Sequence, residues 1–157
     1  MVCLTTGAVV TGCTDDGATR AHSKPPSAND VLSGSCGLLD DEQVSAAIGV
    51  QLEGSQINPV SCGWNRPDES IPTVMVSVAP GTIDPGGDPA TPTTEKAPTL
   101  QNVVTEWHQS ALPSGTRLSA SSKGWTVTVD VGPTAKSPAR AAASIMDKTL
   151  ERLPTAT

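Results

Sequence analysis

Two segments alternate regularly between apolar and polar residues, and this period of two predicts half-buried β-strands. The first is 73–79, which we expect to pair with 59–65 across the turn-forming stretch between them. The second is 125–131, which we expect to pair with 116–121 across the turn "SSKG". The residues predicted to face the core are Val74, Val76, Val78, Trp125, Val127, Val129 and Val131, while Thr126, Thr128 and Asp130 share the outer face of the second hairpin.

Three further segments place apolar residues every three or four positions, which predicts amphipathic helices over 36–49, 99–112 and 137–153. Trp107 is read as a core residue of the second of these helices. The predicted buried residues of the three helices are Val44, Ala47 and Ile48; Leu100, Val103, Val104, Trp107 and Ala111; and Ala142, Ile145, Met146, Leu150 and Leu153.

The ends of the first and last helices carry clear signals. Asp40 is the expected N-cap of the first helix, and Gln43 completes a capping box with it. Gly49 supplies a left-handed stop. In the last helix, Ser137 is the expected cap and Pro138 occupies the first helical position.

Together these elements predict one α+β domain over 36–153. Its antiparallel sheet is built from two hairpins with three helices, in the order helix, hairpin, helix, hairpin, helix. The segment 80–98 contains five prolines and predicts an irregular loop. The segment 13–35 is rich in Ser, Gly and Pro, which is typical of a flexible linker, and we read His22 within it as solvated.

Composition limits the core and the partners of this domain. The 157 residues include no Phe or Tyr, so the core depends on Val, Leu, Ile and Ala around three Trp residues. The net charge is −6, with no basic stripe, which excludes nucleic acid as an expected partner. An anionic lipid surface would not attract the chain either, so membrane contact requires apolar or covalent means.

The first 12 residues suggest an export signal. Segment 1–12 is uncharged and mildly apolar, ends in small residues, and is too short to span a bilayer, which takes roughly 20 apolar residues. The basic start of a secretory signal is missing, which indicates a start codon further upstream. Cys3 lies in this segment and should be lost with it.

The sequence "VTGC" follows, with an aliphatic residue, a small residue, Gly and Cys. It resembles the lipobox of bacterial lipoproteins. The resemblance implies that Val10, Thr11 and Gly12 are recognition residues and that Cys13 receives a diacylglycerol. The signal is then cleaved before Cys13, and the new amino terminus is acylated. The expected location is the outer face of the cytoplasmic membrane, within the cell envelope. An ordinary N-terminal segment with a chance Gly-Cys is the alternative.

Cys36 and Cys62 remain in the domain. In an exported chain, two such cysteines predict a disulfide. It would close 25 intervening residues, which corresponds to about 3 kcal/mol in the chain-entropy model. A zinc site is the alternative, but neither cysteine has a close Cys or His at zinc-binding spacing, so no metal is expected.

The segment "CGLLDDEQVSAAIG", followed by "CGW", resembles actinobacterial lipoproteins with a domain grouped as DUF3558. These proteins show Cys-x-Leu-Leu before a helix that ends in Gly, and then a Cys-x-Trp strand. The matching residues are Cys36, Leu38, Leu39, Gly49, Cys62 and Trp64. The resemblance covers 36–153. It implies an envelope lipoprotein of mycobacteria or their relatives, and it implies no reaction, because none is established for the family.

Catalytic signatures are missing from the sequence: there is no Gly-x-Ser-x-Gly elbow, Ser-x-x-Lys, P-loop or His-Glu-x-x-His. Asp40, Asp41 and Glu42 could form a metal or acid–base cluster, but helix capping explains them. His108 lacks a recognisable nucleophile and orienting acid.

The sequence therefore favours a ligand-binding or sensory interaction module of the envelope, with an unknown small molecule or protein as partner. No catalytic residue, cofactor or metal is expected. A passive structural lipoprotein is the first alternative and a hydrolase-type enzyme the second. An apolar pocket would favour binding.

Overall fold

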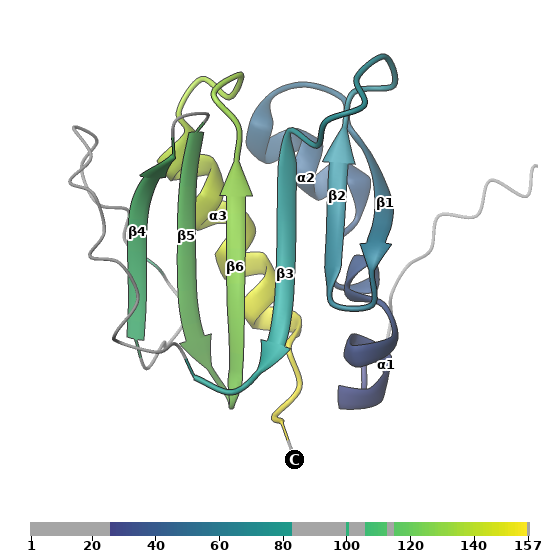
Figure 1. Cartoon of the computed structure of the whole chain (residues 1–157), viewed down its shortest axis with the longest axis vertical. Helices are drawn as coiled ribbons and strands as arrows, with labels where there is room; N and C mark the ends of the chain where they lie inside the picture. The colour runs from purple at the N-terminus through teal and green to yellow at the C-terminus, as the bar shows by residue number, and fades with distance from the viewer. Residues whose placement is uncertain (1–25, 83–99, 101–105, 113–114, 157) are drawn as a thin grey trace, which may run out of the picture.

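The computed structural model describes residues 26–82, 100, 106–112 and 115–156. These residues form a six-stranded antiparallel sheet with helices packed on one face (Figure 1), which confirms the α+β class. The strands lie in the order β1-β2-β3-β6-β5-β4. Their bounds are β1 Glu53–Asn58, β2 Ser61–Asn65, β3 Val74–Pro80, β4 Glu106–Leu112, β5 Gly115–Ser122 and β6 Trp125–Val131.

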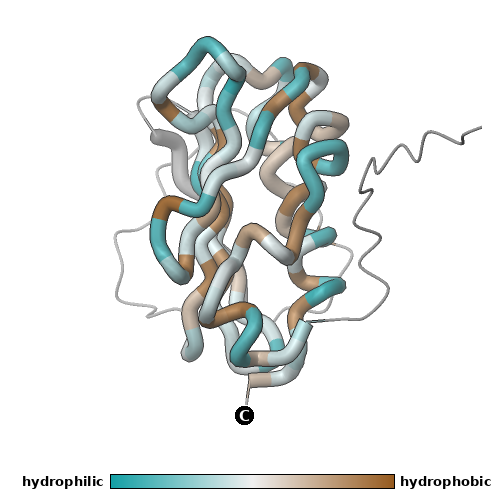
Figure 2. The backbone as a smooth tube through the Cα atoms, turned by 90° about the vertical axis from the view of Figure 1, so that its right-hand side faces the viewer, coloured by the Kyte–Doolittle hydropathy of each residue, from teal (hydrophilic) through white to brown (hydrophobic). Residues whose placement is uncertain are grey.

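The helices form the second layer. In chain order they are α1 Ala28–Ser33, the short 3₁₀ helix η1 Ser35–Leu38, α2 Asp41–Ile48 and α3 Pro138–Arg152. The last helix packs across β5 and β6, and α2 packs beside it. Seen from the side, the helices lie together on one side of the sheet (Figure 2).

Both predicted hairpins form. β2 pairs with β3, and β5 pairs with β6 across Lys123 and Gly124. Both turn residues have positive φ, 53° and 82°, as a two-residue turn that matches the strand twist requires. The sequence did not predict how the hairpins meet: β3 pairs with β6 over the full length of both strands, so two three-stranded units join at the centre of the sheet.

The helix ends agree with the capping signals. Asp40 and Gln43 form the predicted capping box, in which the Gln43 Oε1 accepts from the Asp40 N–H at 3.2 Å. Gly49 ends α2 in the left-handed region at φ 87°. The last helix begins at Pro138, with Ser137 in the N-cap position.

The predicted helix over 99–112 is wrong in its described part, because residues 106–112 form β4. This strand pairs with β5 along its whole length, from Glu106 opposite Ser121 to Leu112 opposite Gly115. A short apolar stripe does not distinguish a helix from a strand, and pairing with a distant strand overrides local preference. The order helix, hairpin, helix, hairpin, helix is therefore also wrong.

Two elements lie where the sequence predicted none. The stretch 28–33, inside the expected linker 13–35, forms α1, and its Val31 is 1% exposed in the core. The folded part thus begins before residue 36. β1 has six exposed residues and no apolar alternation, which explains why its pattern gave no signal.

The core lies between the sheet and the helices. All seven hairpin residues predicted to face it are at most 1% exposed. The largest fully buried side chains include Trp64 and Trp125 as well as Ile145, Met146 and Leu150 of α3. The predicted loop 80–98 lies outside the described residues except for Pro80, which ends β3, and Gly81 and Thr82, which follow it.

Candidate functional site

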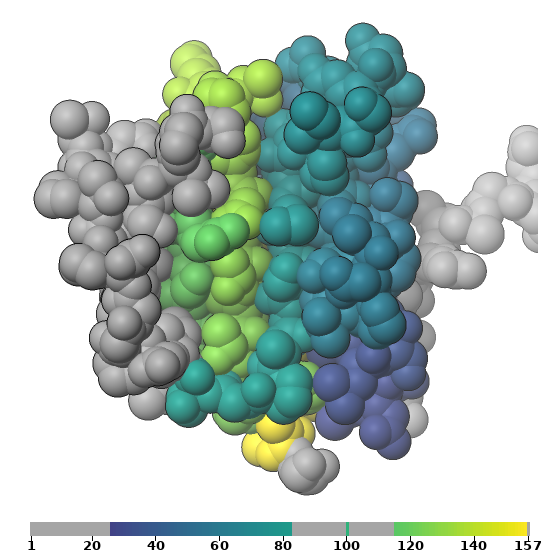
Figure 3. Space-filling view, viewed as in Figure 1, coloured from purple at the N-terminus to yellow at the C-terminus, as the bar shows by residue number. Residues whose placement is uncertain are grey.

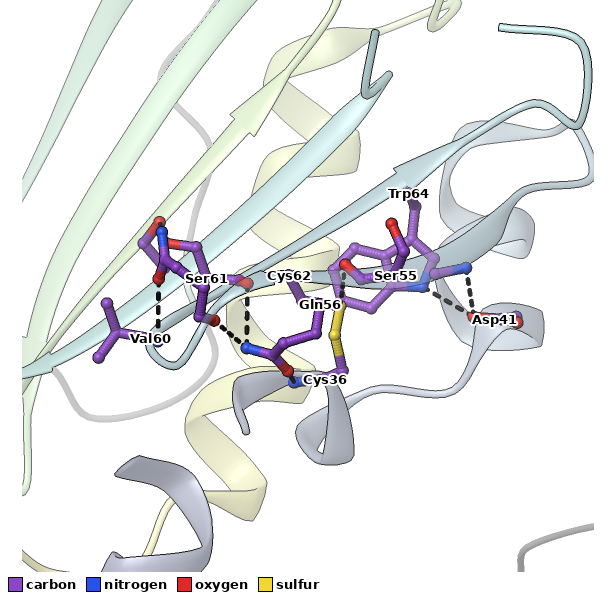
Figure 4. Close-up of a disulfide and its surroundings, with 11 residues drawn as sticks. Cys36, Asp41, Ser55, Gln56, Val60, Ser61, Cys62 and Trp64 are labelled. Carbon is purple, nitrogen blue, oxygen red and sulfur yellow. Dashed lines mark hydrogen bonds between the residues drawn. A yellow bond between two sulfur atoms is a disulfide. The ribbon is translucent and has the colours of Figure 1, made fainter. Parts of the chain in front are cut away.

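Cys36 and Cys62 form the predicted disulfide, with their Cα atoms 5.1 Å apart (Figure 4). The bond joins η1 to β2, and Cys62 is fully buried. Gln56 of β1 lies beside it, with its Oε1 3.5 Å from the Cys36 N–H that donates to it. The Cys62 Sγ lies 3.4 Å from the carbonyl oxygen of Ser55. The disulfide therefore fastens the segment that leads into the domain to an inner strand of the sheet.

The acids at 40–42 serve the fold. Asp41 Oδ1 accepts the indole N–H of Trp64 at 2.9 Å and the backbone N–H of Gly54 at 3.0 Å. Asp40 Oδ2 lies 3.3 Å from Nη2 of Arg152. Glu42 is exposed. Two of these three carboxylates thus hold β1, β2 and α3 around the start of α2.

A hollow of about 570 Å³ lies between α2 and β1. Its lining combines the carboxylates of Asp41, Glu42 and Glu53 with Ser45, Gln51, Leu52 and Gly54, so the hollow is acidic but not uniformly polar. Across the described ranges, no group of three or more His, Cys, Asp and Glu residues is arranged to hold a metal ion.

The sheet face opposite the helices is formed by side chains of the strands (Figure 3). On β5 and β6 these side chains pair with one another. Arg117 donates two hydrogen bonds to Asp130, at 2.7 and 2.8 Å, and Ser119 and Thr128 share one of 3.1 Å. The hydrogen bond to Asp130 raises the pKa of Arg117 above its ordinary value and outweighs the opposing effect of burial. This part of the face is polar and internally satisfied.

Over β1 to β3 the same face is mixed: Ser61 and Ser77 share a hydrogen bond of 2.8 Å, and the face also carries apolar side chains. Ile57 is 48% exposed and Ile71 is 78% exposed, while Met75 of β3 lies opposite Gly63 of β2 in register. A Cβ on Gly63 would lie 2.7 Å from Ile57 Cδ1 and 3.0 Å from Pro72 Cγ. Both side chains therefore close over the strand at a position that only glycine leaves open. We call Ile57, Ile71, Pro72 and Met75 the isoleucine patch.

At the outer edge of β1, next to this patch, two backbone groups already have partners within the chain. The Gly54 N–H donates to Asp41, and the Gln56 side-chain amide donates to the Asn58 carbonyl oxygen and, at 3.2 Å, to that of Ser61. The pairing with β2 also shifts register between Gln56 and Asn58. Such devices keep an edge strand from pairing with another chain.

Several predicted residues lie outside the described part of the chain: Cys3, Val10, Thr11, Gly12, Cys13 and His22. Trp107 and His108 lie in β4, opposite Ala120 and Ser119 in register, rather than in a helix. Among the described residues, none of the helices combines the length and apolar character needed to cross a bilayer.

Comparison of the chain with family models, curated proteins and solved structures gives no match. The family resemblance consequently depends on its six motif residues. Sequence reasoning did not find the isoleucine patch. Its one signal was Gly63, because an isolated glycine inside a strand indicates a close approach by other groups.

Proposed function

We propose that the chain is an exported lipoprotein, anchored through Cys13 to the outer face of the cytoplasmic membrane, where it acts as an interaction module of the cell envelope. The Cys36–Cys62 disulfide is the observation that carries this proposal. Disulfides persist in oxidising compartments and are rare in the cytosol of mesophiles. The six motif residues add support for a place among the actinobacterial envelope lipoproteins with a DUF3558-like domain.

The choice among the three function classes depends on what the described surface offers. The three carboxylates of the hollow beside α2 disfavour an anionic small molecule, and we propose a macromolecular partner instead. A passive structural role predicts a uniformly solvated sheet face. The polar half over β5 and β6 agrees with that role, but the isoleucine patch does not, because exposed apolar clusters mark interaction sites. We assign no catalytic role to the chain.

Phase partition tests the anchor. The gene is expressed with its native 5′ flanking sequence in an actinobacterial host, and the protein is followed between detergent and aqueous phases. The wild type should enter the detergent phase, and Cys13→Ser should move to the aqueous phase. Cys3→Ser is the matched control and should behave as the wild type, since Cys3 is removed with the signal. An unchanged partition of Cys13→Ser would refute the anchor.

A further inference from the structure

We propose that the isoleucine patch is a docking surface for a protein partner that presents apolar side chains flanked by Lys or Arg. This inference rests on the proposed function, because it assigns a surface and a partner class to the same interaction module.

The patch combines side chains from β1, from the segment that leads into β3 and from β3 itself. Among the described residues, the large hydrophobic side chains that are exposed are Leu32, Ile57 and Ile71, and two of these three belong to the patch. Pro72, which follows Ile71 in the chain, approaches Gly63 together with Ile57. An apolar centre of this kind is typical of the energetically dominant part of a protein interface.

The patch is built on rigid support. Gly63 lies between Cys62 and Trp64, which point to the opposite side of the sheet. Cys62 is held there by the disulfide, and the Trp64 indole is held by Asp41. Both residues are at most 1% exposed. A preorganised surface loses little conformational freedom on binding, which favours affinity.

The edge of β1 favours docking through side chains over docking by strand addition. A partner that adds a strand needs the outward N–H and C=O groups of an edge. At β1, the Gly54 N–H and the Asn58 carbonyl already have partners within the chain. A partner at this end of the sheet therefore meets the side chains of the face.

The charges around the patch select the partner. Glu53 lies on the same side of β1 as Ile57, by strand alternation, and Asp68 is exposed in the loop that carries Ile71. Asp130, opposite Met75, is neutralised by Arg117, and Arg66 lies 3.6 Å from Glu69. The rim is thus acidic. With a net charge of −6, a second copy or an anionic lipid headgroup would be repelled, whereas a basic rim is complementary.

Site-specific photo-crosslinking in the native cells tests the surface. A photoreactive amino acid replaces Ile71 in the full, anchored chain, and a matched probe replaces Glu151, which is exposed on α3. The probe at 71 should give one discrete protein adduct that the probe at 151 does not give. The crosslinked partner peptide should carry Lys or Arg beside apolar residues. Adding Glu53→Lys and Asp68→Lys together should reduce the adduct several-fold.

Four results would overturn the proposal: no adduct from position 71, equal adducts from both positions, an adduct of twice the chain mass, or an adduct of lipid mass. Thermal unfolding checks that the Glu53→Lys, Asp68→Lys variant folds. If that variant is unfolded, Met75→Ser with the probe at 71 replaces it, and Met75→Ser should also weaken the adduct. Detergent partition is scored in the same cells, so an anchored chain without an adduct refutes the docking surface alone, and an aqueous chain refutes the proposed function.

Discussion

The indole N–H of Trp64 donates to Oδ1 of Asp41 over 2.9 Å, and the Gly54 N–H donates to the same oxygen over 3.0 Å. Trp64 is 1% exposed, so its N–H has no access to bulk water. One carboxylate in the first turn of α2 therefore satisfies a buried side chain of β2 and the edge of β1. This link joins the helix to the strand that the disulfide also holds.

Asp41→Ala should lower the free energy of unfolding by about 1–3 kcal/mol, because it leaves the buried indole N–H without an acceptor. Glu42→Ala is the matched control. It removes the same charge from the same turn but leaves the acceptor of the Trp64 indole N–H in place, and should cost under about 0.5 kcal/mol. Urea unfolding of both variants measures the difference. If both variants lost the same free energy of unfolding, the Asp41 carboxylate would act only through its charge at the start of the helix, and the account would be contradicted.

Reduction of the Cys36–Cys62 bond should lower the melting temperature by on the order of 10 °C, since about 3 kcal/mol is at stake in a domain of this size. The double variant Cys36→Ala, Cys62→Ala should melt at a similarly reduced temperature and should not respond to reductant. Both thiols of the non-reduced wild type should resist alkylation. Free alkylation of both thiols in exported protein would contradict the account.

Gly63→Ala should destabilise the domain by about 1 kcal/mol, because the new methyl group would meet Ile57 and Pro72 at 2.7 and 3.0 Å. Gly37→Ala is the control, since a Cβ there meets nothing within 4 Å, and it should stay within about 0.5 kcal/mol of the wild type. Adding Ile57→Ala should recover part of the loss at 63. Thermal or urea unfolding that shows no such coupling would place Ile57 away from Gly63.

Arg117→Gln should cost under about 1 kcal/mol, because the Arg117 side chain is 46% exposed and the pair with Asp130 is screened by solvent. The pKa of Arg117 is raised in the folded state, so its contribution is complete below the ordinary arginine pKa and is lost only as the pH rises through the folded value. The difference between variant and wild type should therefore stay constant from about pH 6 to about pH 9. A slope in that window, measured by urea unfolding, would contradict this assignment.

The sequence was sufficient to predict those helices and strands whose bounds are set by residues within the same segment. Asp40, Gln43 and Gly49 set the bounds of α2 through groups within the same helix, and the valines of β3 and β6 alternate because one face is buried. Those elements form as predicted.

The sequence was insufficient to predict the strands whose conformation depends on pairing with residues far away in the chain. The stretch 106–112 satisfies its backbone by pairing with β5, a choice that a local apolar stripe does not encode. β1 is exposed at every position and depends on β2 and on Asp41, which is 13 residues away from Gly54 in the chain. The candidate surface shares this origin, since Ile57, Gly63 and Pro72 come from three separate segments and meet only in the folded sheet.

The mass of the N-terminal peptide of the protein, isolated from the membrane fraction of its native cells, tests the central claim most directly. The account predicts a mature chain that begins at Cys13 and carries a diacylglyceryl group on its Sγ together with an acylated amino terminus. An unmodified Cys13 within a peptide that continues upstream through Gly12 would contradict it.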